Sequence, residues 1–188
     1  MHSLCLPVPV RWWPSPHFSK GRSSMVDMVV IHAISLPPGV FGTGCIIDLF
    51  MGRLDIKAHP SFQGLEGLRV SAHFLIERDG QIHQFVHTDD TAWHAGESQF
   101  QGRQGCNDFS VGVELEGDQI NSFTDAQYQA LEILLVALMR AYPAITPARV
   151  VGHNQVAPGR KWDPGPMFDW ERLRRALEHS NTLRVQRK

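Results

Sequence analysis

Long apolar runs are missing from this sequence, and so is an excess of charge of either sign. No apolar stretch approaches the roughly eighteen residues that a membrane-spanning helix needs. The chain carries 18 basic and 19 acidic side chains, a formal net charge of -1, which gives no electrostatic reason to expect a nucleic-acid partner. We therefore expect neither a membrane nor a nucleic acid as partner, and a small molecule of mixed polarity instead.

Cysteine is also scarce. The chain has three cysteines, Cys5, Cys45 and Cys106, which lie far apart and form no C-x-x-C pair. This odd number and spacing suggest neither a disulfide framework nor a thiolate metal site. Residues 1–22 are interrupted by prolines at positions 7, 9, 14 and 16 and lack the continuous apolar segment of a secretory signal. These absences predict free thiols, a reducing compartment and a cytoplasmic location.

The sequence shows no internal repeat, low-complexity tract or linker. Its 188 residues, 43% of them hydrophobic and 20% charged, suit one globular domain with a sizeable core. We expect an N-terminal arm at 1–22 that packs on the domain, the domain itself at 23–180, and a flexible C-terminal tail at 181–188.

Apolar patterns predict several strands. The run Met25–Ile31 is rich in β-branched residues and leads into His32, while residues 72–86 have the pattern of a hairpin that turns at Asp79-Gly80. Ser110–Glu116 alternates with period two, so both of its glutamates would project from one side of a strand. The apolar stretch 149–151 predicts a further strand. The strands would deliver polar residues to one edge of an α/β domain.

Two helices are also predicted. Thr124 to Gln127 has the form of a capping box, and apolar residues recur behind it at helical spacing until Pro143. A second helix is expected from about Asp169 to about Glu178, with one apolar stripe.

The Pro- and Gly-rich segment 152–166, which we expect to be non-helical, holds the most chemistry. His153 and Asp163 lie ten positions apart within it, and His32 follows another buried strand. Imidazole and carboxylate are ordinary zinc ligands, and a catalytic zinc site needs three protein ligands and one open position for water. His32, His153 and Asp163 could therefore hold zinc. Taken alone, His32 could equally be a core histidine whose ring bonds a backbone carbonyl.

Hydrolysis also needs a proton shuttle and a group that stabilises the oxyanion. Glu114, on the polar face of its predicted strand, is the natural general base and acid; the alternative is a carboxylate in a salt bridge. Lys161 could stabilise the oxyanion; the alternative is an exposed loop lysine.

A resemblance to a known family covers nearly the whole chain, from about Trp13 to Trp170. It is carried, in this order, by the strings VVIHAISLPPGVFG, LRVSAHFLIERDG, AWHAGESQFQGR, CNDFSVGVELEG, TDAQYQAL and GHNQVAPGRKWDPGP. The chain resembles the AmpD family, the cytoplasmic 1,6-anhydro-N-acetylmuramyl-L-alanine amidases of Gram-negative bacteria, within the wider group of zinc amidases and peptidoglycan recognition proteins. The resemblance implies a single α/β domain with a central mixed β-sheet flanked by α-helices.

The resemblance also implies roles for individual residues. By motif position, His32, His153 and Asp163 would bind Zn²⁺. Glu114 would be the proton shuttle, and Lys161 would assist the transition state.

Four further positions match the family's substrate cleft. Arg69 resembles the arginine that receives a peptide carboxylate, a task that suits a guanidinium fork. Trp93, His94 and Ala95 would line the groove for sugar or stem peptide. Without the resemblance, a surface arginine and ordinary core aromatics are equally good interpretations.

Two positions depart from the family pattern. Ala33 follows the first ligand where asparagine is expected, and Gly105 stands where a second basic residue is usual. These departures predict altered contacts with peptide or sugar, although the metal set is complete.

The resulting hypothesis is a zinc-dependent amidase that acts as a monomer on small-molecule anhydro-muropeptides. It would cleave the amide between the lactyl group of anhydro-N-acetylmuramic acid and L-alanine during cytoplasmic muropeptide recycling. Two alternatives stay open: an amidase that acts on intact peptidoglycan outside the cytoplasm, and a muropeptide-binding module without activity.

Overall fold

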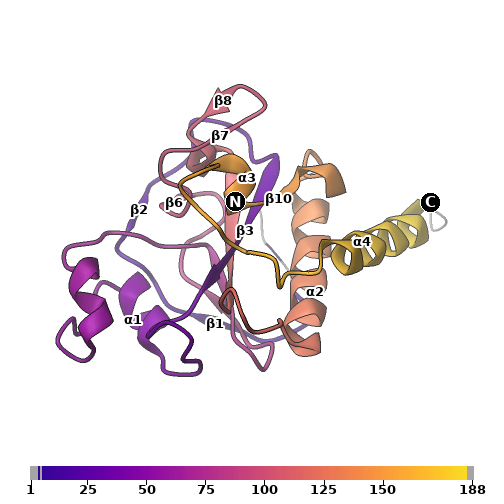
Figure 1. Cartoon of the computed structure of the whole chain (residues 1–188). Coiled ribbons are helices and arrows are strands. Elements are labelled where there is room, and N and C mark those ends of the chain that lie inside the picture. The colour runs from indigo at the N-terminus through magenta and orange to yellow at the C-terminus, as the bar shows by residue number, and fades with distance from the viewer. Residues whose placement is uncertain (1–3, 5, 186–188) are drawn as a thin grey trace.

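A six-stranded mixed β-sheet forms the centre of the protein in the computed structural model, which describes residue 4 and residues 6–185 (Figure 1). Four neighbouring strands run parallel, β5 is antiparallel to β4, and β1 is parallel to β5 at the edge. The α/β fold with a mixed sheet is the one predicted. In spatial order the strands are β1 (Val10–Trp12), β5 (Ile82–Gln84), β4 (Phe74–Ile76), β9 (Ser110–Glu116), β3 (Met28–Ile34) and β10 (Val150–Gly152).

Shorter elements surround this sheet. Two antiparallel pairs join β2 (Phe18–Ser19) to β6 (Thr91–Ala92) and β7 (Gln99–Phe100) to β8 (Arg103–Gln104). The α-helices are α1 (Cys45–Phe50), α2 (Asp125–Ala141), α3 (His153–Val156) and α4 (Trp170–Val185), and the 3₁₀ turns are η1 (Pro60–Leu65), η2 (Cys106–Asp108) and η3 (Pro147–Arg149).

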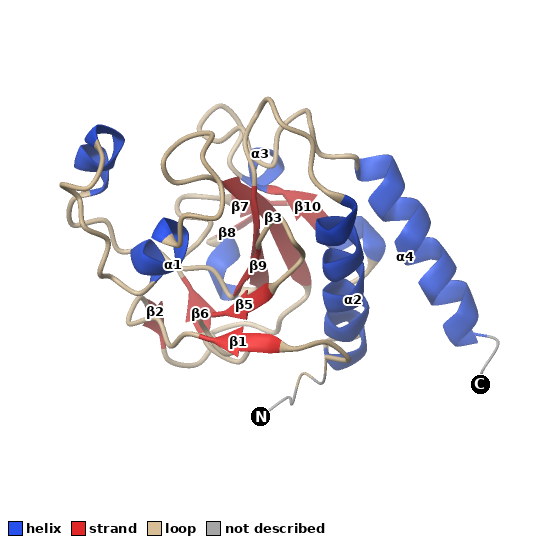
Figure 2. Cartoon of the chain, turned by 90° about the horizontal axis from the view of Figure 1, so that it is seen from below, coloured by secondary structure: helices blue, strands red, loops and turns tan. Residues whose placement is uncertain are grey.

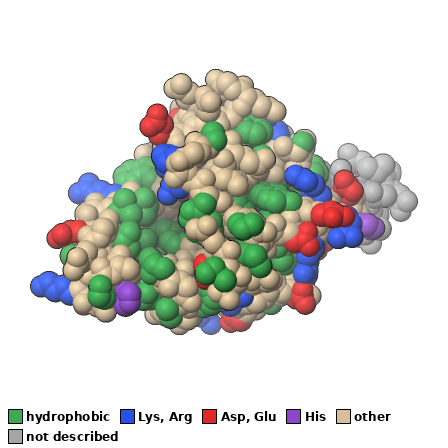
Figure 3. Space-filling view, in the orientation of Figure 1, with side chains coloured by type: hydrophobic (Ala, Val, Ile, Leu, Met, Phe, Trp, Pro, Cys, Tyr) green, Lys and Arg blue, Asp and Glu red, His purple; other side chains and the backbone are tan. Residues whose placement is uncertain are grey.

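The helices cover the two faces of the sheet unequally. Figure 2 shows α2 and α4 on one side of the sheet and α1 on the other. The main core lies under α2, where Leu131, Leu135 and Leu138 pack with Val111 and Val113 of β9. Figure 3 shows charged side chains grouped over α4, so this helix is apolar inward and charged outward.

Several predicted elements are confirmed. The hairpin pairs Ile76 with Ile82 around the predicted Asp79-Gly80 turn, β9 has the predicted bounds, and α2 begins with the predicted capping box. Cys45 and Cys106 are free, as predicted, whereas Cys5 lies outside the described residues.

Other elements differ from expectation. β3 continues to Ile34, so His32 lies inside the strand rather than after it, because β9 pairs with the strand along its whole length. The segment expected to be non-helical contains α3, a single turn in which the Gln155 side chain accepts the Gly152 N–H at 2.8 Å. The predicted arm contains β1 and β2, which pair with β5 and β6, strands that lie much later in the sequence.

The C-terminal helix is longer than predicted. α4 ends at Val185, so the predicted boundary at residue 180 falls inside it, and residues 186–188 lie outside the described residues. The division into arm, domain and tail stays a prediction. None of the helices in the described part of the chain is long and apolar enough to cross a membrane.

Candidate metal centre

Strand register brings three predicted site residues together. β3 lies between β9 and β10 and is parallel to both, with His32 aligned with Glu114 and Ile31 aligned with Gly152, the residue before His153. Neighbouring strands lie about 4.8 Å apart, so residues at aligned or adjoining positions of the three strands are close together. The two histidines therefore become neighbours although they lie 121 positions apart.

Asp163 completes the group. The Nδ1 atoms of His32 and His153 are 2.9 Å apart, and Asp163 Oδ2 lies 3.2 Å from the first and 2.9 Å from the second. All three side chains are buried, and their three candidate ligand atoms lie within 4.8 Å of one another. Two imidazole nitrogens and one carboxylate oxygen that converge in this way suit zinc with one coordination position left for water.

The charge states of the three residues also suit a metal. Burial lowers the pKa of His32 to about 4, and the neighbouring His153 lowers it further, against the opposing effect of Asp163. Burial would raise the pKa of Asp163, but the rings of His153 and His32 beside its carboxylate hold it well below its usual range. Near neutral pH the centre therefore offers a neutral His32 imidazole and an ionised carboxylate, the forms that bind metal ions.

Glu114 lies beside this group. Its Oε1 is 4.0 Å from His32 Nδ1, and its Oε2 is buried without a hydrogen-bond partner among the described residues. Burial first, and then the negative charge of Asp163, raise the pKa of Glu114 well above its usual value, while Lys161 opposes the shift. A carboxyl group with a raised pKa can both take and return a proton near neutral pH.

Lys161 is exposed on the loop between α3 and Asp163. Its backbone N–H donates to the carbonyl of Ala157 at 3.1 Å, which closes the loop onto the end of α3. The ammonium charge lowers the pKa of both His32 and Glu114, so its field reaches the centre. The exposed Lys161 side chain stays a predicted partner for the oxyanion.

His94 and Ala95 lie behind the two histidines. His94 Nδ1 is 3.0 Å from His32 Nε2, and the carbonyl oxygen of Ala95 is 3.1 Å from His153 Nε2. Ala95 is fully buried. Both residues, predicted from the resemblance to line the substrate groove, thus contact the metal-site histidines.

Trp93 and Arg69 are both found near His17. The Trp93 ring stacks on the His17 ring at 6.3 Å between centroids, and its Nε1 donates to Ser19 Oγ at 3.0 Å. Arg69 is exposed and, together with His17 and Leu68, lines a pocket of about 220 Å³. The two predicted contact residues are therefore both near His17, a residue of the predicted N-terminal arm at 1–22.

Three residues that support the centre were not predicted. Asn107 Oδ1 accepts the backbone N–H groups of His94 and Ala95 at 3.1 and 2.7 Å. Ser110 Oγ lies 3.3 Å from His94 Nε2, and a Cβ at Gly112 would collide with the His94 ring. A glycine inside a strand often marks such a close approach, so Gly112 carried a readable signal, whereas Asn107 carried none.

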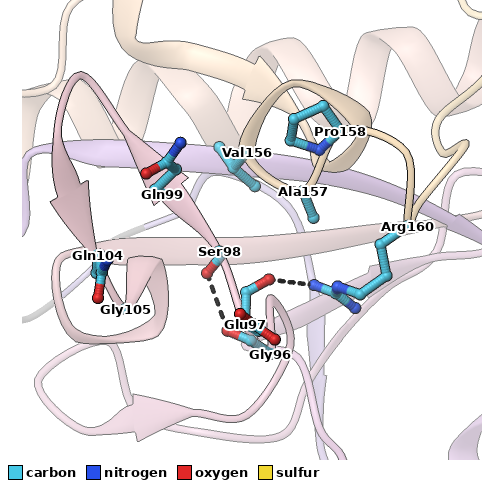
Figure 4. Close-up of a pocket in the computed structure, with 10 residues that line it drawn as sticks. All are labelled: Gly96, Glu97, Ser98, Gln99, Gln104, Gly105, Val156, Ala157, Pro158 and Arg160. Carbon is cyan, nitrogen blue, oxygen red and sulfur yellow. Dashed lines mark hydrogen bonds between the residues drawn. The ribbon is translucent and has the colours of Figure 1, made fainter.

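A larger pocket, of about 460 Å³, lies beside α3 (Figure 4). Arg160 lines this pocket and donates to the carbonyl of Ala95, the oxygen that also faces His153. Gly105, one of the two departures from the family pattern, lines this pocket. Ala33, the other departure, packs in the main core.

Sequence comparisons place this geometry among known proteins. A family model described as N-acetylmuramoyl-L-alanine amidase matches residues 22–166. The 1,6-anhydro-N-acetylmuramyl-L-alanine amidase AmpD of Haemophilus influenzae is 54% identical over 159 residues, which cover 84% of this chain and 86% of that relative. AmpD of Escherichia coli is 51% identical over 170 residues, which cover 90% of this chain and 92% of that relative.

Solved structures agree with these relatives. A crystal structure of a selenomethionine AmpD derivative has a TM-score of 0.86 and 52% identity, over 89% of this chain and 94% of the other. The amidase AmiD of Escherichia coli, in complex with the substrate anhydro-N-acetylmuramic acid-L-Ala-D-γ-Glu-L-Lys, has a TM-score of 0.60 and 29% identity, over 84% of this chain and 60% of AmiD.

Proposed function

The chain belongs to the N-acetylmuramoyl-L-alanine amidase family, and on that premise we propose that it hydrolyses anhydro-muropeptides with the help of zinc. The bond cleaved is the amide between the lactyl group of 1,6-anhydro-N-acetylmuramic acid and L-alanine. The observation that carries the proposal is the convergence of two buried histidines and Asp163 within reach of Glu114. The AmpD relatives, which are 54% and 51% identical in sequence to this chain, support the choice of substrate.

His32, His153 and Asp163 would hold the zinc. The ligand atoms already face one another, and the ionised Asp163 suits a cation. When bound, zinc would supply a Lewis acid that polarises the scissile carbonyl and lowers the pKa of water, so that water loses a proton more easily and attacks the carbonyl.

Glu114 moves the proton in the proposed reaction. Its carboxylate takes a proton from the attacking water and returns it to the departing amine of L-alanine. The buried Oε2, which lacks a partner among the described residues, is free for this exchange. The raised pKa of Glu114 makes it a stronger base than an exposed glutamate and a usable acid near neutral pH.

Lys161, Arg69 and Trp93 would bind the reacting molecule. The Lys161 ammonium stabilises the negative charge that develops on the carbonyl oxygen. The exposed Arg69 guanidinium receives a carboxylate of the stem peptide, and the half-buried Trp93 ring packs against peptide or sugar. The protein acts as a monomer in the cytoplasm, where it recycles fragments of the cell wall, and needs neither membrane nor nucleic acid.

Mass spectrometry of anhydro-muropeptide cleavage tests this function. Glu114→Gln keeps the shape of the side chain but removes the base, so we expect a rate lower by about 10² to 10⁴. Asp163→Asn removes a charged ligand and is expected to lose both zinc and activity. Glu171→Gln, at an exposed acid on α4, is the control and should cleave as the native protein does. Native activity in both site variants would contradict the proposal.

The same assay separates the alternatives. Faster cleavage of intact sacculi than of anhydro-muropeptide by the native protein would favour a wall-degrading amidase. A purified protein that held no zinc and cleaved neither substrate would favour a binding module.

A further inference from the structure

The two metal-site histidines are arranged alike. Each points Nδ1 at Asp163, and each points Nε2 away from the centre, toward a group of the 94–95 segment. His32 Nε2 faces the ring of His94 at 3.0 Å, and His153 Nε2 faces the carbonyl of Ala95 at 3.1 Å. Consecutive residues on one loop therefore contact both histidines from behind.

The ring nitrogen that carries the proton in each histidine follows from hydrogen-bond partners that can only accept, namely backbone carbonyls. The carbonyl of Ala95 can only accept, so His153 carries its proton on Nε2 and leaves Nδ1 bare. For His32 the chain is longer. The Ser110 hydroxyl donates its proton to the carbonyl of Cys106 at 2.5 Å, because a carbonyl can only accept. Ser110 Oγ therefore accepts from His94, 3.3 Å away, and the proton of His94 lies on Nε2.

This direction of hydrogen bonding continues to the metal centre. With its proton on Nε2, His94 has a bare Nδ1 that accepts the Nε2–H of His32. His32 is then left with a lone pair on Nδ1, the atom that faces Asp163. Both histidines thus present an unprotonated nitrogen to the same point.

The surrounding backbone is built to keep His94 in place. Gly112 leaves room for the ring, because any larger residue there would collide with it. Asn107 holds the backbone N–H groups of His94 and Ala95, and Arg160 donates to the Ala95 carbonyl at 2.6 Å. Two parts of the chain, residues 107–112 and Arg160, thus support one short loop.

We propose that His94 is a positioning residue, which fixes the proton of His32 on Nε2 and thereby keeps Nδ1 ready to bind zinc. The proposal deepens the function inferred above and rests on the zinc site, but it concerns metal affinity rather than cleavage. Partners of this kind orient a ligand ring and raise its basicity, and their loss typically weakens metal binding by about 10- to 100-fold. His94 therefore acts through His32 and does not need to touch the substrate.

A matched pair of variants tests the proposal. His94→Asn places its side-chain oxygen where Nδ1 of the histidine lies, so it can still accept from His32. His94→Leu has the same size as Asn but no acceptor. In competition with a chelator, we expect the Leu variant to bind zinc about 10- to 100-fold more weakly than the native protein, and the Asn variant to recover most of that loss. Equal zinc affinity in the two variants would overturn the proposal.

Nitrogen NMR of the zinc-loaded native protein provides a test that does not depend on how the variants fold. We expect the imidazole of His32 to carry its proton on Nε2 and to bind zinc through Nδ1. The opposite assignment would overturn the proposal. A native protein that binds zinc with the expected ring assignment but cleaves no muropeptide would refute the proposed function and leave the role of His94 supported.

Discussion

His73 shows how one buried ring affects the response of this protein to acid. The ring is fully buried; its Nδ1 accepts the Gly112 N–H at 3.0 Å, and its Nε2 lies 3.1 Å from the Asp90 carbonyl and 2.8 Å from the Arg22 guanidinium. The His94 ring packs against it at 5.7 Å between centroids. Burial first, and then the charge of Arg22, lower the pKa of His73 well below its usual value of 6.5.

This shift predicts a loss of stability in acid. Below pH 6.5 the unfolded chain binds a proton at His73 that the folded protein does not, so the free energy of unfolding falls as the pH falls. We expect His73→Gln to reduce the slope of this free energy between about pH 6 and about pH 5 by up to about 1.4 kcal/mol per pH unit. Urea unfolding of zinc-free protein at several pH values measures the slope.

The exposed His179 supplies the matched control for this measurement. His179→Gln on α4 should keep the native slope. A native slope in His73→Gln as well would show that the ring at position 73 is protonated in the folded protein.

At the scale of single elements, α2 is tied to the sheet through its first turn. Thr124 Oγ1 accepts the Gln127 N–H, and Gln127 Oε1 accepts the Thr124 N–H, both at 3.1 Å. The buried Gln127 amide also donates to the carbonyls of Glu116 and Ile76 at 2.8 and 3.2 Å. The cap therefore holds the helix against β9, the strand that carries Glu114.

Removal of this cap should destabilise the protein. Thr124→Ala leaves the Gln127 N–H without its acceptor, and we expect the free energy of unfolding to fall by about 1 kcal/mol. Chemical denaturation measures the change. Thr146→Ala is the control, because Thr146 precedes the 3₁₀ turn η3 without a side-chain cap and should change stability by less than about 0.5 kcal/mol. Equal effects of the two substitutions would mean that the capping box contributes no more than an exposed threonine.

At the scale of the whole molecule, the proposed zinc site joins parts of the fold that are remote in sequence. His32 comes from β3, next to the edge strand of the sheet, while His153 and Asp163 come from α3 and the loop that follows it. An ion that binds only when these parts are together stabilises the folded state by mass action. Stability and metal binding should therefore change together.

Zinc removal tests this connection. At a free zinc concentration about 1,000 times the Kd, the folded state gains about 4 kcal/mol over the zinc-free protein, so a chelator should lower the Tm measurably. Calorimetric unfolding of native protein with and without chelator gives the difference. Asp163→Asn should show a much smaller dependence on zinc, and an identical Tm of native protein in both conditions would argue against a folded-state zinc site.

Much of the fold could be predicted because local patterns specify it. Alternation in Ser110–Glu116, the Asp79-Gly80 turn and the Thr124 capping box each act through neighbouring residues, and each is confirmed. β1 and β2 were missed because their hydrogen bonds go to strands more than sixty positions away. The helical turn at His153 was missed because it depends on a contact between Gly152 and the Gln155 side chain that no periodicity reveals.

For the candidate site, the sequence by itself determined the residue types and their family pattern: two histidines and Asp163, together with Glu114 and Lys161. It did not show that these residues lie close together in space. Only the tertiary structure decided that the register of β9, β3 and β10 aligns three of these side chains. It also decided that His94 lies behind His32, because the room for that ring depends on a glycine in another strand. The chemical type of each side chain can be read from the sequence. The distances between the site residues, and the ring nitrogen that carries the proton in each histidine, depend on contacts between segments that are distant in the sequence.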